Sequence, residues 1–255
     1  MNTSTSREKR RLTIDAADLH YSELNRMLRE AVLGGADTIE LRNVAGQRYI
    51  GTNLKMPVEL QIHGTPGNDL GAFMDGPHIV VHGNAQDGCG NTMNDGKIVV
   101  HGHAGDIIGL SARGGKIFVR EGVGYRAAIH MKEYKGKKPA LVIGGTAQDF
   151  LAEYMAGGIV VVLGLNGGNG SSHQPRFVGT GMHGGVIYLR GQIKEWQLGK
   201  EVGSAALDEN DRKTLATLVN EFAAHFGCDT TPILAAPFIK LFPLHLRPYS
   251  ELYAY

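Results

Sequence analysis

The segment IVVHG stands at residues 79–83 and again at residues 98–102, and weaker copies of it run along most of the chain. The copies are LQIHG at 60–64, IFVRE at 117–121, LVIGG at 141–145, VVVLG at 160–164 and IYLRG at 187–191. Successive copies lie 19, 19, 19, 24, 19 and 27 residues apart, and IELRN at 39–43 is an irregular first copy. A strand that recurs at a fixed step indicates a solenoid, in which each repeat packs on its neighbours.

Small residues occupy fixed places between these strands. Glycine makes up 36 of the 255 residues, about twice the usual share, and it costs backbone entropy unless a tight turn requires it. The glycines that close the coils are Gly76, Gly96, Gly115, Gly158 and Gly185. A methionine column, interrupted by Ala112, holds Met74, Met93, Met155 and Met182. Because methionine fills irregular interior space, this column is interpreted as a ladder in the core.

We predict a mainly β chain: a right-handed parallel β-helix, or solenoid, of about seven coils with flanking N- and C-terminal helices. Residues 1–36 are expected to form an N-terminal tail and capping helix, residues 37–200 the parallel β-helix domain, and residues 201–255 a C-terminal helix and docking tail. The first helix is expected to begin at Asp18 and stop at Gly34–Gly35, and the second to run from Asp208 to Gly227. Helices at both ends would cover the open edges of the stack.

The overall composition narrows the classes of partner. Lys and Arg number 26 against 25 Asp and Glu, so nothing favours binding to nucleic acid or to an anionic membrane. Cys89 and Cys228 lie far apart and support neither a disulfide framework nor an iron–sulfur site. The N-terminus is polar, and the longest apolar run, 159–165, is too short to span a bilayer. We therefore expect a soluble cytoplasmic protein.

Two polar columns are the candidates for chemistry. Stacked His63, His82 and His101 would lie in a line, whereas the ligands of one metal must converge, so a ladder facing solvent or a partner is favoured over a metal site. A second column lies at a turn and is formed by Asn68, Asp87, Asp106 and Asp149. Such side chains usually cap their own backbone amides, and this interpretation is favoured over catalytic carboxylates. No catalytic, cofactor-binding or metal-binding residue is assigned.

Other features suggest contacts rather than chemistry. The side chains between the inward pairs of the strands point outward yet are apolar; they are Val80, Val99, Phe118, Val142, Val161 and Tyr188. We call them the outer apolar ladder, and either the chain's own C-terminal segment or a partner subunit must cover it. The lysine-rich insertion at 130–139 is either solvated or in contact with an acidic partner. The glycine-rich stretch at 164–172 lacks the GK[ST] ending of a phosphate loop and is interpreted as a loop insertion.

A family resemblance follows from the segments between the strands. These are GQRYIG at 46–51, GNDLGAFMDG at 67–76, GNAQDGCGNTMNDG at 83–96, GYRAAIHMKEY at 124–134, EYMAGG at 153–158 and GMHGG at 181–185. Together they resemble the GXGXG domain, the C-terminal β-helix domain of the glutamate synthase large subunit, over about residues 12–192, and most closely its free-standing subunit form. A more distant resemblance is to the C subunit of formylmethanofuran dehydrogenase. Ala128 and Ala152 depart from the glycines of the repeat, which indicates a divergent branch.

The resemblance implies a non-catalytic structural subunit of a multi-subunit oxidoreductase of the glutamate synthase kind. Amidotransferase and FMN/iron–sulfur synthase-type partners would then carry the glutamine- and 2-oxoglutarate-dependent chemistry. FMN and iron–sulfur clusters would be bound by those partner subunits and not by this chain. Two alternatives stay open: a β-helix subunit of a formylmethanofuran dehydrogenase-like or other one-carbon complex, and a stand-alone solenoid enzyme acting on a polymer.

Overall fold

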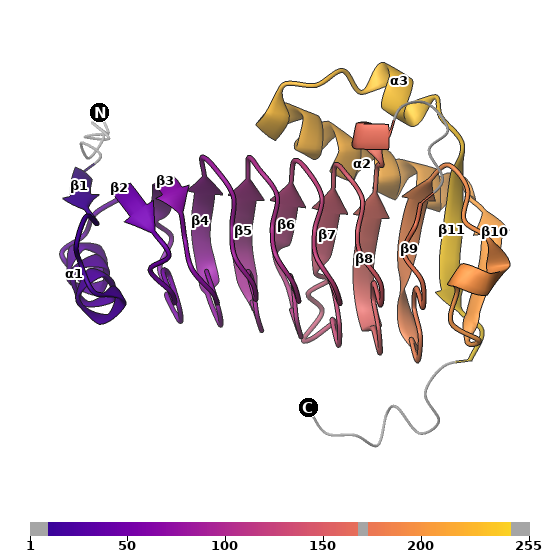
Figure 1. Cartoon of the computed structure of the whole chain (residues 1–255), viewed down its shortest axis with the longest axis horizontal. Coiled ribbons are helices and arrows are strands. Elements are labelled where there is room, and N and C mark those ends of the chain that lie inside the picture. Colours follow the sequence, from indigo (N-terminus) through magenta and orange to yellow (C-terminus); the bar gives the residue numbers. More distant parts are fainter. Residues whose placement is uncertain (1–9, 168–172, 246–255) are drawn as a thin grey trace, which may run out of the picture.

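The computed structural model describes residues 10–167 and 173–245, so residues 168–172 of the glycine-rich insertion lie outside the described part. Within it the strands form one 11-stranded sheet in the order β1 to β9, then β11 and β10 (Figure 1). The parallel strands are β1 (Arg11–Asp15), β2 (Thr38–Ala45), β3 (Glu59–Thr65), β4 (Asp75–Val81), β5 (Asp95–Val100), β6 (Lys116–Val119), β7 (Ala140–Ile143), β8 (Ala156–Val162) and β9 (Gly184–Arg190). The expected parallel solenoid is confirmed.

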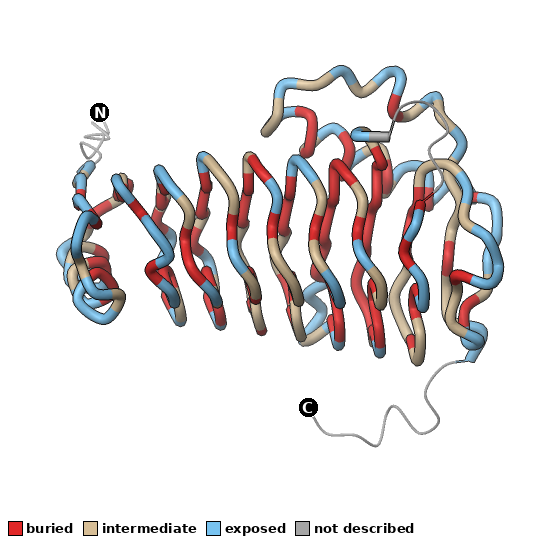
Figure 2. The backbone as a smooth tube through the Cα atoms, in the orientation of Figure 1, coloured by how far each residue is buried: buried red, intermediate tan, exposed pale blue. Residues whose placement is uncertain are grey.

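The strands pair in the register that the repeat predicts. Ile79 pairs with Ile98, Ile98 with Ile117, and Ile117 with Leu141 across the longer step. The same row continues through Val160 to β9. Like residues therefore stack one above another, and their buried side chains fill the inside of the coils. Figure 2 shows buried positions recurring from coil to coil along the stack.

The stack ends differently from the expectation of about seven coils. After β9 the chain adds no further coil, and β11 (Phe238–Pro243) pairs with β9 in the antiparallel direction. The strand β10 (Val202–Ala206) then pairs with β11 and lies at the edge of the sheet. The solenoid has about six turns, and an antiparallel strand from the C-terminal segment occupies the place of the next coil. The FIKLFP segment thus docks on the solenoid itself.

The N-terminal helix closes the other end. Helix α1 (Tyr21–Leu33) begins after His20 and not at Asp18, because Asp18 adopts a left-handed turn conformation with φ of 58°. Leu24, Leu28 and Val32 of α1 are buried and belong to the core of the solenoid. Strand β1 precedes the helix and extends the parallel sheet by one strand, which the repeat did not predict. A helix and a short strand thus cover the apolar end of the first coil.

Methionine side chains form a ladder inside the coils that is interrupted by Ala112, as predicted. The structure adds Met131 to the column. The extra residues of this longer coil follow Met131 and precede β7, so Met131 keeps its place in the column. The fully buried members are Met74, Met93, Met131, Met155 and Met182. The small Ala112 stands in the column between Met93 and Met131 and is also buried.

Each coil turns through three left-handed residues at alternate positions. In one coil these are Gly88, Gly90 and Thr92, with φ of 70°, 71° and 51°. The middle position faces the core: a Cβ on Gly90 would lie 2.4 Å from Cδ1 of Ile117. The whole middle column consists of Gly51, Gly71, Gly90, Gly109, Ala128, Ala152 and Gly179, all with positive φ. Glycine recurs there because it alone combines a left-handed backbone with no side chain.

Candidate functional site

The chain's own C-terminal helix covers the outer apolar ladder. Helix α2 (Glu209–Phe226) is capped by Asp208 and ends at Gly227 in a left-handed conformation, close to the predicted limits. Its buried Leu215, Val219 and Phe222 pack with the ladder in a second apolar cluster outside the coils. Figure 1 shows α2 lying across the strands, with α3 (Thr231–Leu234) beside it. Of the two coverings expected for the ladder, the structure has the self-covered one.

The length of α2 matches the length of the ladder. Its 18 residues rise about 1.5 Å each, or about 27 Å in total. The ladder spans β4 to β9, five steps of about 4.8 Å, or about 24 Å. On β3 the same row becomes polar, because Gln61 pairs with Val80 in register. The apolar surface therefore ends where the helix ends.

Charged groups fix both ends of α2 to the sheet. Near the C-terminal end, Glu221 binds Lys97 of β5 and Lys116 of β6, with 2.5 Å from its Oε2 to Nζ of Lys116. At the N-terminal end, Asp211 accepts hydrogen bonds from Tyr188 (2.7 Å) and Lys240 (2.9 Å). Burial opposes ionisation of Asp211, but the bonds from Lys240 and Tyr188 hold its pKa below the ordinary value. These bonds fix the position of α2 along the sheet, in addition to the burial of its apolar side.

Replacing Asp211 with Asn is expected to lower the unfolding free energy at pH 7 by about 1–3 kcal/mol, because charge-assisted bonds to Tyr188 and Lys240 are weakened. The folded pKa of Asp211 is depressed, so its stabilisation is present above the unfolded value of about 3.9 and is lost as the pH falls through the folded pKa. Urea unfolding of both proteins at pH 7 and at about pH 2 measures this difference, which shrinks as the acid protonates Asp211 in the folded protein.

The control is Glu209→Gln in the first turn of the same helix. Glu209 pairs with Lys213, but both side chains are largely exposed, so the loss should stay below about 0.5 kcal/mol. Equal losses in the two variants at pH 7 would contradict a special role for Asp211.

The histidine ladder is stacked, as expected. The rings of His63 and His82 lie 4.5 Å apart and those of His82 and His101 5.4 Å apart, and Phe226 of α2 meets His101 edge-on. Burial lowers the pKa of His82, with further lowering from His63 and His101. Burial followed by the charge of Arg120 does the same for His101. These two rings are therefore neutral at pH 7, and among the described residues no group of His, Cys, Asp or Glu converges on a point that could hold a metal.

The aspartate column connects coils rather than capping its own turn. Oδ1 of Asp87 accepts a hydrogen bond from the amide of Asp106 (2.8 Å), and Oδ1 of Asp106 accepts one from the amide of Tyr125 (2.8 Å). Asp149 does the same for Arg176 at 2.8 Å. We expected these side chains to cap amides of their own turn, and this expectation is wrong. They accept hydrogen bonds from amides of the next coil, which stacking brings close. These carboxylates thus link successive coils of the stack.

Sequence reasoning missed an exposed row of aromatic rings at the left-handed corners. Tyr154 and Phe177 have positive φ and are about half exposed. Tyr154 stacks on His130 at 5.4 Å, and Phe177 on Phe150 at 4.9 Å. The sequence did contain a signal for these rings. Phe177 occupies the repeat position that Gly88 holds in another coil, and Tyr154 the position that Gly181 holds. A left-handed conformation costs a non-glycine residue about 1–2 kcal/mol, so these rings occupy strained places on the surface.

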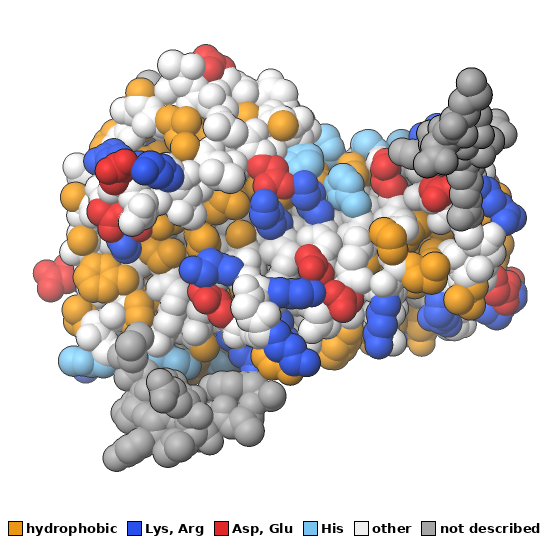
Figure 3. All heavy atoms as spheres, turned by 180° about the vertical axis from the view of Figure 1, so that it is seen from behind, with side chains coloured by type: hydrophobic (Ala, Val, Ile, Leu, Met, Phe, Trp, Pro, Cys, Tyr) orange, Lys and Arg blue, Asp and Glu red, His pale blue; other side chains and the backbone are white. Residues whose placement is uncertain are grey.

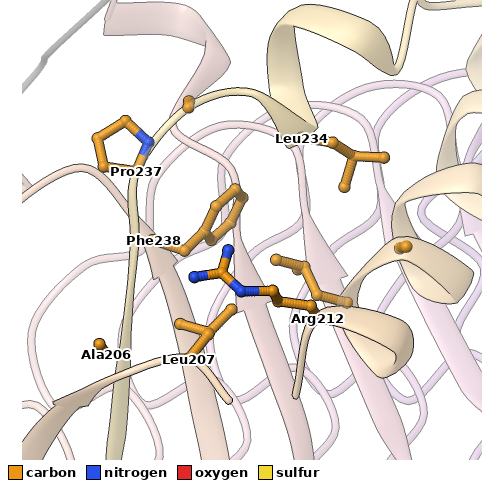
Figure 4. Close-up of a pocket in the computed structure, with 9 residues that line it drawn as sticks. Ala206, Leu207, Arg212, Leu234, Pro237 and Phe238 are labelled. Carbon is orange, nitrogen blue, oxygen red and sulfur yellow. The ribbon is translucent and has the colours of Figure 1, made fainter. Parts of the chain in front are cut away.

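An apolar cavity of about 370 Å³ lies beside the outer cluster (Figure 4). Leu207 and Phe238 line it from the β10 and β11 side, Leu215 from α2, and Leu234 from α3. The guanidinium of Arg212 lies between Leu207 and Phe238 in this view. The lining is apolar apart from Arg212, so the cavity suits an apolar group next to a positive charge.

The remaining surface is mixed in charge. Figure 3 shows Lys and Arg intermingled with Asp and Glu across the middle of one face, with histidines nearby. A shallow hollow of about 520 Å³ on this surface includes Lys97, Lys116 and Lys137, and each of them pairs with a carboxylate. Cys89 is buried, which raises the pKa of its thiol to about 12 and makes it unreactive. No helix in the described ranges is long and apolar enough to cross a membrane.

Known proteins resemble this chain in sequence and in fold. The uncharacterized protein MJ1350 of Methanocaldococcus jannaschii is 46% identical over 250 residues, which cover 95% of this chain and 96% of the relative. A chain in the X-ray crystal structure of the formyltransferase/hydrolase complex from Methylorubrum extorquens, in complex with methylofuran, shares the fold. The TM-score is 0.57 at 18% identity, over 91% of this chain and 89% of the other. The GXGXG motif model matches residues 36–244, and the chain belongs to the GXGXG motif family.

Proposed function

We propose that this protein is a non-catalytic structural subunit of a multi-subunit oxidoreductase, most closely one like glutamate synthase, and that it works in the cytoplasm. Its partners would be amidotransferase and FMN/iron–sulfur synthase-type subunits. The flavin and the clusters would be bound in those partners, and this chain would hold the catalytic subunits in register. Glutamine would supply the nitrogen and 2-oxoglutarate would receive it, in reactions that take place outside the solenoid.

The observation that carries this proposal is that the repeated columns serve the stack itself. Apolar and methionine columns fill the core, and the aspartates hold the amides of the next coil. A regular, rigid stack of this kind is suited to present one long surface to other proteins. The resemblance of the repeat to the glutamate synthase β-helix gives the proposal its host complex.

A second candidate is a β-helix subunit of a formyl-transfer complex. It is favoured by the shared fold with a chain of the Methylorubrum extorquens complex, whose title names formyl transfer and hydrolysis. The sequence identity of 18% supports the fold alone, so this candidate ranks second.

The test is purification of the chain by itself and, tagged, from its native cell. The isolated protein is expected to show no flavin absorbance and neither glutaminase nor glutamate-forming activity. The tagged chain is expected to bring down an FMN-containing synthase-type subunit in stoichiometric amount. FMN bound one-to-one to the isolated chain would overturn the proposal. Recovery of formyl-transfer subunits instead would establish the second candidate.

A further inference from the structure

The lysine-rich insertion folds into a defined hairpin. Tyr134 and Lys137 exchange both backbone hydrogen bonds, at 3.1 and 3.0 Å. Between them Lys135 and Gly136 have φ of 50° and 75°, and two successive left-handed residues are typical of a type I′ turn. Both tip residues are exposed. The insertion is thus a built projection from the stack, at the place where the repeat lengthens to 24 residues.

Ion pairs anchor the base of this hairpin. Nζ of Lys137 lies 3.1 Å from Asp75 and 2.9 Å from Asp95, at the starts of β4 and β5. Lys138 pairs with Glu133 at 3.3 Å. The carboxylates near the hairpin are therefore engaged by Lys137 and Lys138, which hold it against two earlier coils.

The other cations of the region face an aromatic ring. The guanidinium of Arg113 lies 5.5 Å from the ring centre of Tyr134, and Nζ of Lys135 lies 5.3 Å from it. Within the described residues, Nε of Arg113 is buried and has no hydrogen-bond partner. Lys132 follows one coil after Arg113, since its amide bonds to the carbonyl of Ala112 (3.0 Å). Burial and then the charge of Arg113 lower the pKa of Lys132, so these two cations lie close enough to influence each other.

We propose that Arg113, Lys132, Tyr134 and Lys135, together called the basic hairpin surface, dock an acidic segment of a partner subunit. This inference rests on the proposed function, because it names the surface through which the scaffold holds one partner. A carboxylate presents the planar acceptor pair that a guanidinium binds best, so an acidic side chain suits the guanidinium of Arg113.

The surroundings favour a protein segment over a free anion. The exposed His130 and Tyr154 rings stack beside the hairpin, on the outward side of the buried Met131 and Met155. They offer apolar area that a peptide side chain would cover and that a small anion would leave exposed. The whole chain has a net charge of only +1, so the positive potential is local and gives no long-range attraction to nucleic acid.

The test is reversal of charge at two exposed or half-exposed lysines. The tagged Lys132→Glu/Lys135→Glu variant is expected to recover one partner subunit about tenfold less well than the wild type. Recovery by the wild type should fall as salt is raised from about 0.05 to 0.5 M, because exposed charges are screened. The matched control is Lys200→Glu/Lys213→Glu, which makes the same change in net charge before β10 and in α2, outside the hairpin, and it should recover partners normally.

Each outcome has a distinct meaning. Undiminished recovery by the hairpin variant, or an equal loss in the control, would overturn the docking inference while leaving the scaffold proposal intact. A wild-type chain that recovers no subunit overturns the proposed function, and the inference with it. A salt-sensitive dimer of the purified chain that the variant abolishes would assign the surface to a second copy and refute an acidic partner. If the double variant unfolds, Lys135→Glu alone at the exposed tip repeats the test.

Discussion

Phe118→Ala is expected to lower the free energy of unfolding by about 3–5 kcal/mol, the usual cost of emptying a fully buried aromatic site. Phe118 is 0% exposed although it points away from the inside of the coils. It is buried because α2 lies over it, with the ring of His225 at 5.0 Å. The loss should therefore loosen the helix first, and hydrogen exchange of the α2 amides should rise more than that of the β5–β6 pairing. Urea unfolding gives the magnitude.

Tyr125→Ala, at the turn that follows β6 in the same coil, is the control. Tyr125 is 49% exposed, so removal of its ring should change the unfolding free energy by less than about 1 kcal/mol. An unfolding free energy that is unchanged in Phe118→Ala would mean that α2 does not rest on the ladder in solution. In that case the ladder would again be available to a partner subunit.

Gly90→Ala is expected to cost about 2–5 kcal/mol, the sum of left-handed strain and overpacking. The new Cβ would lie 2.4 Å from Cδ1 of Ile117, so the isoleucine and the coil must shift. The backbone φ of 71° adds strain whatever the available space. Thermal unfolding should show a single transition at a clearly lower temperature.

Gly109→Ala separates the two causes. Gly109 has φ of 70° in the same column, but its nearest neighbour to a new Cβ would lie 3.6 Å away, which is ordinary contact. Its cost should be limited to about 1–2 kcal/mol from the backbone alone. Equal destabilisation in the two variants would show that crowding against Ile117 plays no part.

Most of the fold could be predicted from the repeat in the sequence. Because like residues stack, the spacing of 19 residues was enough to pair Ile79 with Ile98 and Ile98 with Ile117, and even the longer step to Leu141 was found. Helix α2 was predicted almost to the residue, since Asp208 and Gly227 are strong cap signals. Strand β1 was missed because it has no copy of the glycine pattern and a helix separates it from β2.

The candidate sites were less accessible from sequence. An apolar ladder looks the same whether α2 or a partner covers it, so only the placement of Phe222 and Val219 decided the question. The aspartate column was found, but its bonds to the next coil, as from Asp106 to the amide of Tyr125, depend on stacking geometry. The cation cluster around Tyr134 could not be read from the sequence, because Arg113 comes from the preceding coil.

The match in length between α2 and the ladder has a consequence for how such proteins change. One added coil lengthens the stack by about 4.8 Å, which corresponds to about three residues of helix. If the solenoid gained one coil and α2 kept its length, one side chain of the outer apolar ladder, such as Val80, would be exposed to water. If the solenoid lost one coil, the end of α2 would extend beyond the sheet. The length of α2 therefore limits the number of coils whose outer side chains it can cover. Repeat number and helix length must evolve together, whereas an insertion at a corner, such as the one at 130–139, leaves the match between helix and ladder unchanged.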